Sequence, residues 1–117
     1  GGLFRLPASI ARNVAMELAL TGDPISAERA FELGLVNELA EPGAVVDAAL
    51  ELAKRITVNA PIAVRESRQV VLESQGVSDA DGWQITKDHF RVVVKTEDFR
   101  EGPLAFVEKR APVWKGR

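Results

Sequence analysis

The chain has 117 residues, which is enough for one domain with a hydrophobic core and too few for two of ordinary size. Its 15 basic and 17 acidic residues are interspersed and give a formal net charge of -2, so no basic footprint for nucleic acid is present. The absence of cysteine excludes disulfides and suits a reducing compartment, and no apolar run approaches the roughly 20 residues of a membrane span. We therefore expect a cytoplasmic protein with no nucleic-acid or membrane partner.

Helical periodicity dominates the first part of the chain. Apolar residues recur at three-to-four spacing in residues 9–20, which predicts a helix with one apolar face. Gly22 is placed to end this helix as a left-handed cap. A second, short helix is predicted to start at the cap Ser26 and to end at Gly34, with Leu35 folding back onto it.

The remainder of the chain is also predicted to be helical apart from one short piece. Each further helix has a recognisable start, which is a proline suited to a first turn, a serine cap, or the segment Glu101-Gly102-Pro103. In chain order we predict a strand-like piece at 35–39 and helices at 42–57, at 61–74, from the cap Ser78 onward, and at 104–110. The fold class is therefore predicted to be mainly α.

No self-sufficient set of catalytic side chains is visible in the sequence. His89 is the only histidine, and we interpret it as a half-buried structural residue because a general base needs an orienting partner nearby. With neither a cysteine nor a second histidine, no metal site is expected. Ser9, Ser26 and Ser78 are interpreted as helix caps, and the paired carboxylates are placed on predicted solvent-facing surfaces.

The carboxy-terminal end combines aromatic and basic residues within the final dozen positions. Such a set can hold a nucleotide, because a ring packs on a base and cations neutralise phosphate. A solvated terminal helix explains the same residues, so both interpretations stay open at this point. The residues are Phe106, Lys109, Arg110, Trp114, Lys115 and Arg117.

Four segments of the chain, in order and spacing, resemble the enoyl-CoA hydratase/isomerase (crotonase) superfamily. They are GGLFRLP, AMELALTGDPISAERAFELGLVNEL, NAPIAVRESRQVV and EDFREGPLAFVEKRAPVWKGR, and the likeness as a whole extends over essentially all 117 residues. The resemblance is to the carboxy-terminal half of family members. It implies the helical carboxy-terminal portion of a crotonase-like α/β fold whose ββα spiral core is absent from this chain. Residues 1–60 would finish the core and the pocket edge, and residues 61–117 would form trimerisation-type helices.

The resemblance also implies an activity for the parent protein. Family members act on acyl-CoA thioesters through an oxyanion-stabilised enolate, by hydration, dehydration or double-bond isomerisation in fatty-acid or related metabolism. Coenzyme A is part of the substrate, so no separate cofactor is implied. The family's oxyanion amides and acidic residues would precede Gly1, so no residue here is expected to be catalytic and the chain alone is expected to be inactive.

The family resemblance gives the carboxy-terminal residues a role. In relatives the phenylalanine and lysine of AFVEKR reach coenzyme A on a neighbouring subunit, which implies substrate binding by Phe106 and Lys109 in the intact protein. It also implies a homo-oligomer, a trimer or a hexamer. The alternative is a stand-alone helical oligomerisation module that does not bind coenzyme A.

Overall fold

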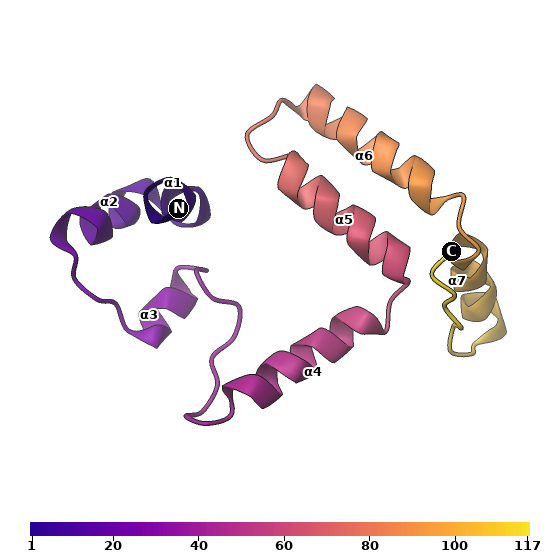
Figure 1. Cartoon of the computed structure of the whole chain (residues 1–117), viewed down its shortest axis with the longest axis horizontal. Helices are drawn as coiled ribbons and strands as arrows, with labels where there is room; N and C mark the ends of the chain where they lie inside the picture. The colour runs from indigo at the N-terminus through magenta and orange to yellow at the C-terminus, as the bar shows by residue number, and fades with distance from the viewer. The chain divides into compact units, whose positions relative to one another are not determined.

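In the computed structural model, which describes residues 1–117, every regular element is an α-helix and no strand is present (Figure 1). The predicted mainly α class is therefore confirmed. The helices in chain order are α1 (Gly2–Ser9), α2 (Arg12–Thr21), α3 (Ala27–Glu32), α4 (Val45–Thr57), α5 (Pro61–Glu73), α6 (Asp79–Val93) and α7 (Asp98–Glu108).

The chain divides into two compact units, Gly1–Ala49 and Leu50–Arg117. In the first unit α1 and α2 pack together, and in the second α5 and α6 lie side by side along their lengths (Figure 1). Helix α4 begins in the first unit and ends in the second. The division between residues 60 and 61 that the family resemblance implies concerns function, and it stays a prediction.

Local signals in the sequence set several helix ends as predicted. Gly22 ends α2 with φ 72°, and Gly34 follows α3 with φ 74°, both in the left-handed region that glycine occupies without a steric penalty. The N–H of Leu35 folds back to donate to the carbonyl of Ala30 at 2.9 Å. Ser26 caps α3 through its hydroxyl. Helices α5 and α6 also begin where predicted.

The predicted single helix at 9–20 is wrong at its start, because residue 9 ends helix α1 and a second helix, α2, follows it. Ile10 is extended, with φ -134°, and this break separates α1 from α2, which begins at Arg12. Ser9 is not a helix cap, because its hydroxyl donates to the carbonyl of Arg5 at 3.1 Å. Such a bond satisfies a carbonyl within the helix that is ending, whereas a cap accepts from the N–H groups of a helix that is starting.

Two predictions between α3 and α4 are wrong. Residues 35–39 form bends and loop instead of a strand, because no second strand lies beside them to pair with their backbone groups. Pro42 lies in a turn rather than in the first turn of α4. The N–H of Ala44 donates to the carbonyl of Glu41 at 2.9 Å, and Gly43 has φ 87°, the pattern of a type II turn.

Helix α7 starts earlier and ends sooner than the predicted helix at 104–110. The hydroxyl of Thr96 accepts from the N–H of Phe99 at 3.1 Å, a capping contact near the start of α7 that the sequence analysis did not identify. Glu101-Gly102-Pro103 therefore lies inside α7, where the proline removes one helical N–H bond without ending the helix. The helix stops where Lys109 turns left-handed, with φ 54°.

His89 on α6 links this helix to α5. Its Nδ1 lies 2.6 Å from the carboxylate of Glu66, and its Nε2 lies 3.3 Å from that of Glu73, both on α5. The histidine side chain is 19% exposed, so it is half-buried as predicted. The hydrogen bond to Glu66 is the largest cause that raises the pKa of His89 above its ordinary value, and the hydrogen bond to Glu73 is the next.

The carboxy-terminal tail, residues 111–117, is fixed to the first turn of α7 by Asp98. This carboxylate is buried and accepts the backbone N–H groups of Lys115 at 2.7 Å and Gly116 at 2.9 Å. The indole N–H of Trp114 donates to the carbonyl of Val58 at 2.7 Å. The tail therefore joins α7 to the residue that follows α4.

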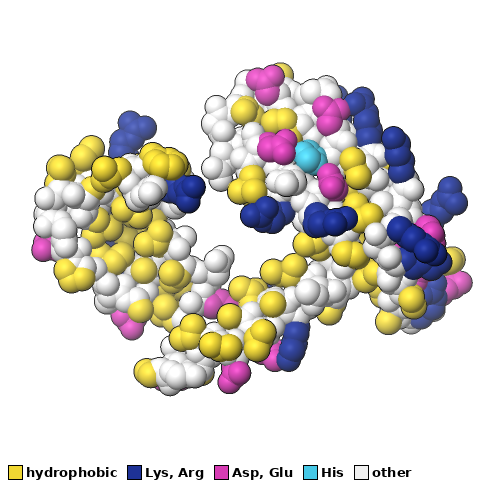
Figure 2. Space-filling model, in the orientation of Figure 1, with side chains coloured by type: hydrophobic (Ala, Val, Ile, Leu, Met, Phe, Trp, Pro, Cys, Tyr) yellow, Lys and Arg dark blue, Asp and Glu magenta, His cyan; other side chains and the backbone are white.

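Few side chains are buried, and the buried apolar ones are small. Apart from Ile10 they are all alanines, Ala15, Ala30 and Ala105. Figure 2 shows hydrophobic side chains exposed over much of α1 to α4. The large apolar side chains exposed by more than three-fifths are Leu3, Phe4, Leu20, Val45, Val46, Val58, Val71, Trp83, Phe106, Val107 and Val113. None of the helices α1 to α7 has the length and the continuous apolar surface that a membrane-spanning helix needs.

We expect Asp98→Asn to release the tail. An amide offers one oxygen where the carboxylate offers two, and its NH₂ group opposes one of the two backbone N–H donors. The expected loss is about 1–3 kcal/mol in the free energy of unfolding, measured by urea denaturation followed by circular dichroism. Asp23→Asn, at an exposed loop carboxylate, is the matched control and should change stability by less than about 0.5 kcal/mol. Equal effects of the two changes would contradict this role of Asp98.

The α5–α6 contact through His89 is expected to depend on pH. Because the folded-state pKa is raised above 6.5, the stabilisation is fully present below that value and is lost as the pH rises through the folded pKa. His89 is the only histidine of the chain, so NMR titration of its ring protons reads this pKa directly. Glu66→Gln should lower the pKa more than Glu73→Gln, since the contact with Glu66 is the shorter one. An ordinary pKa in the unaltered chain would refute the prediction.

Candidate functional site

The structure divides the four cations of the carboxy-terminal cluster into three that are paired and one that is not. Lys115 Nζ lies 2.8 Å from Glu97 Oε2, and Arg117 Nε lies 2.9 Å from Glu97 Oε1. These contacts lower the pKa of Glu97, and the hydrogen bond with Lys115 is the largest cause. Arg110 is also paired, whereas Lys109 is exposed and has no ion-pair partner. Lys109 is therefore the cation of this cluster whose ammonium group is open to an incoming anion.

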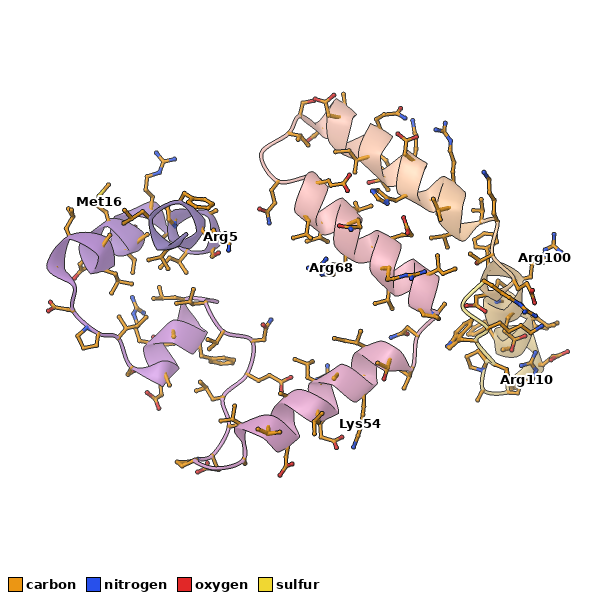
Figure 3. The ribbon with its side chains drawn as sticks, in the orientation of Figure 1. Arg5, Met16, Lys54, Arg68, Arg100 and Arg110 are labelled. Atoms are coloured by element: carbon orange, nitrogen blue, oxygen red, sulfur yellow. The ribbon has the colours of Figure 1, made fainter.

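Arg110 is held by two carboxylates of α7. Its Nη1 and Nη2 lie 2.6 and 3.0 Å from the two oxygens of Glu101, a bidentate pair, and its Nε lies 2.6 Å from Glu108. Glu101 also accepts the backbone N–H of Val113 at 2.7 Å. The contact with Arg110 is the main cause that lowers the pKa of Glu101 to about 2, so this carboxylate stays ionised. Figure 3 labels Arg110 beside α7.

The two predicted binding residues are both open to solvent at the carboxy-terminal end of α7. Phe106 is 85% exposed, the highest value among the large apolar side chains, and Lys109 follows it by three positions. Trp114 differs from them. Its indole bonds to Val58, and its ring lies close enough to Gly102 that a Cβ there would be 3.4 Å away. Trp114 is therefore used in the fold, and Phe106 is the ring that remains free.

A separate apolar hollow lies between α1 and α2 in the first unit. Its volume is about 610 Å³, and it is open to solvent. The side chains that line it are almost all apolar, including Leu3, Leu6, Pro7 and Met16, the last of which is labelled in Figure 3. Such a hollow can accept an apolar chain, but it offers no set of polar groups for a reaction.

The carboxylates that pair with Arg110 and with the cations of the tail were not predicted from the sequence. Glu101 and Arg110 are nine positions apart, and Glu97 and Lys115 are eighteen apart, so neither pair follows the three-to-four spacing of helical neighbours. The pairs form because the chain reverses after α7. The density of acidic residues before Gly102 and of basic residues after Glu108 is the only sequence signal that points to them.

Comparison with known proteins identifies the family. The family model described as enoyl-CoA hydratase/isomerase matches residues 1–117. Among curated proteins, the carnitinyl-CoA dehydratase of Salmonella arizonae is 35% identical over 120 residues, which is 99% of this chain and 46% of that protein. The carnitinyl-CoA dehydratase of Salmonella typhi is also 35% identical, over 100% of this chain and 46% of its own length. The chain thus spans about half the length of the curated relatives it matches.

Solved structures agree with this comparison. A crystal structure of enoyl-CoA hydratase from Mycobacterium tuberculosis matches 100% of this chain and 46% of its own, with 49% identity and a TM-score of 0.95. An enoyl-CoA hydratase from Bacillus anthracis matches 100% of this chain and 45% of its own, with 39% identity and a TM-score of 0.95. The strand-free chain corresponds to the helical carboxy-terminal part of the crotonase fold, as expected. Since the match extends over all its residues, the chain belongs to the enoyl-CoA hydratase/isomerase family.

Proposed function

We propose that this chain is the carboxy-terminal part of an enzyme that acts on acyl-CoA thioesters by hydration, dehydration or double-bond isomerisation. The observation that carries the proposal is the family match over residues 1–117, together with relatives named enoyl-CoA hydratase and carnitinyl-CoA dehydratase. In such chemistry negative charge develops on the thioester oxygen, and preorganised backbone N–H groups stabilise it. We assign those N–H groups, and the acid and base, to a part of the parent enzyme outside these residues.

The assignment of no catalytic residue to this chain is supported by the contacts of its titratable groups. Both ring nitrogens of His89 lie beside carboxylates, Glu97 is paired with Lys115 of the tail, and Glu101 is paired with Arg110. A general base needs a free lone pair within reach of the proton that it removes. The half-buried histidine and these carboxylates instead connect one part of the chain to another.

The proposed contribution of this chain to binding is a contact between coenzyme A and the pair Phe106 and Lys109, in the active site of a neighbouring subunit. The free ammonium group of Lys109 can neutralise a phosphate, and the exposed ring of Phe106 can pack against the adenine. Coenzyme A enters as part of the substrate, so no separate cofactor is proposed.

We further propose that the parent enzyme is a cytoplasmic homo-oligomer, a trimer or a hexamer. The support for assembly is the exposed apolar surface on α7, where Leu104 is 50%, Phe106 85% and Val107 77% exposed. Exposed apolar residues gathered on one element are typical of interaction surfaces. In this arrangement one subunit would supply Phe106 and Lys109 to the substrate of another.

The activity is tested with crotonyl-CoA, whose ultraviolet absorbance falls when water adds across the double bond. The complete gene product that contains this chain is expected to hydrate crotonyl-CoA, and the 117-residue chain alone is expected to show no turnover. The gene product heated until it unfolds is the negative control. Turnover by a purified preparation of the chain alone would overturn the assignment of all catalytic groups to other residues.

The coenzyme A contact is tested by calorimetric titration of the complete gene product with coenzyme A. Lys109→Ala and Phe106→Ala are each expected to weaken binding by about tenfold, because each removes one charge-assisted or stacking contact. Lys87→Ala, at an exposed lysine of α6 with no ion-pair partner, is the matched control and should leave the affinity unchanged.

The same titration separates the proposal from its alternative. If neither substitution changes the affinity for coenzyme A, the proposed contact is wrong. If the gene product also assembles normally without binding coenzyme A at all, the stand-alone oligomerisation module becomes the better description. Size-exclusion chromatography of the same samples reports the assembly.

A further inference from the structure

The backbone of Lys109 is the exception among the left-handed residues of the chain. Lys109 has φ 54° and ψ 38°, and it is the only residue other than glycine with a positive φ. The other positions of this kind all carry glycine, namely Gly22, Gly34, Gly43, Gly76 and Gly116. A side chain in this region costs free energy that glycine avoids, so a lysine here points to a use for its side chain.

Helix α3 ends with the same pair of backbone hydrogen bonds and shows what the turn itself requires. There the N–H of Gly34 donates to Phe31 and that of Leu35 to Ala30, both at 2.9 Å. This is a Schellman motif, in which glycine takes the left-handed position and an apolar residue follows it. Neither a lysine nor an arginine is needed to form the turn.

Helix α7 forms this motif with different residues. The N–H of Lys109 donates to the carbonyl of Phe106 at 3.2 Å, and that of Arg110 donates to the carbonyl of Ala105 at 3.0 Å. Arg110 occupies the place that Leu35 has after α3. Ion pairs from Arg110 to the carboxylates of α7 replace the apolar contact that commonly closes the motif.

The pair Glu101–Arg110 fixes the chain immediately after Lys109. Arg110 is held at its backbone by Ala105 and at its guanidinium group by both oxygens of Glu101. Glu101 is the better shielded partner, with a side chain 18% exposed against 38% for Arg110. Its second contact, to the N–H of Val113, fixes the carboxylate itself. Lys109 therefore lies between a helix and a clamped arginine, and its own ammonium group remains unpaired.

We propose that Glu101 is a positioning residue for coenzyme A: by clamping Arg110 it holds Lys109 in the left-handed conformation that presents the lysine ammonium group to the phosphates of this ligand. This inference rests on the proposed contact between Lys109 and coenzyme A. Glu101 itself touches no ligand in this proposal. Its contribution is to make one direction of the Lys109 side chain the populated one before the ligand arrives.

The test is a double-mutant cycle in the complete gene product, with the dissociation constant for coenzyme A as the readout. Glu101→Gln is expected to weaken binding by about fivefold when Lys109 is present, and by less than about twofold in the Lys109→Ala background. In turnover of crotonyl-CoA, Glu101→Gln should raise KM and leave kcat unchanged, because the lost interaction is with a remote part of the substrate. Glu108→Gln, which removes the more exposed partner of Arg110, is the matched control and should have the smaller effect.

Two further variants keep the inference testable if Glu101→Gln unfolds. Arg110→Lys breaks the same clamp from the other side and should reproduce the rise in KM. Lys109→Gly should leave the midpoint of thermal unfolding unchanged or higher, since glycine favours this conformation, yet lose as much affinity for coenzyme A as Lys109→Ala.

The outcomes separate the inference from the function on which it rests. If Lys109→Ala leaves the affinity for coenzyme A unchanged, the proposed contact fails and the inference fails with it. If Lys109→Ala weakens binding but Glu101→Gln has no effect, or has the same effect in both backgrounds, the contact stands and the positioning role of Glu101 is refuted. A fall in kcat with unchanged KM would also refute it.

Discussion

Three carboxylates at the start of α7, Glu97 just before its first turn and Asp98 and Glu101 within it, organise the carboxy-terminal part of this protein. Asp98 accepts hydrogen bonds from two backbone N–H groups of the tail. Glu97 forms ion pairs with two cations of the tail, and Glu101 forms an ion pair with the guanidinium group of Arg110. Acidic groups are favoured at this end of a helix, because its free N–H groups give it a partial positive charge. These ion pairs occupy Arg110, Lys115 and Arg117, which would otherwise compete with Lys109 for an anionic ligand.

Most of the large apolar side chains, unlike these carboxylates, have few partners within the chain. Three of the four buried apolar residues are alanines, and burying an alanine removes little apolar surface from water. Large side chains such as Leu3, Phe4 and Phe106 lie on the surface of the chain instead. Polar contacts of His89 link α5 to α6, and those of Asp98 fix the tail to α7, while many large apolar side chains stay exposed for contacts with other residues.

Local signals predicted what depends on a few neighbouring residues. Ser26 and Ser78 cap helices, and Gly22 and Gly34 end them, because each effect involves atoms within one turn. The strand-like piece at 35–39 failed because a strand depends on a partner, which periodicity alone cannot reveal. The start of α7 was predicted too late, because a glycine-proline pair usually precedes a helix. Here the hydroxyl of Thr96 accepts from the N–H of Phe99, and the helix begins before that pair.

The candidate site also has residues that could be predicted from the sequence and contacts that could not. The family resemblance pointed to Phe106 and Lys109, but only the fold shows that Arg110, Lys115 and Arg117 are occupied, since chain reversal brings their partners to them. The place of Trp114 in this reversal gives the protein an intrinsic optical reporter. Its indole N–H is bonded to Val58, whereas Trp83 is 66% exposed, so the two rings sense different surroundings. Detachment of the tail should shift the fluorescence emission of Trp114 to longer wavelength, with no label attached.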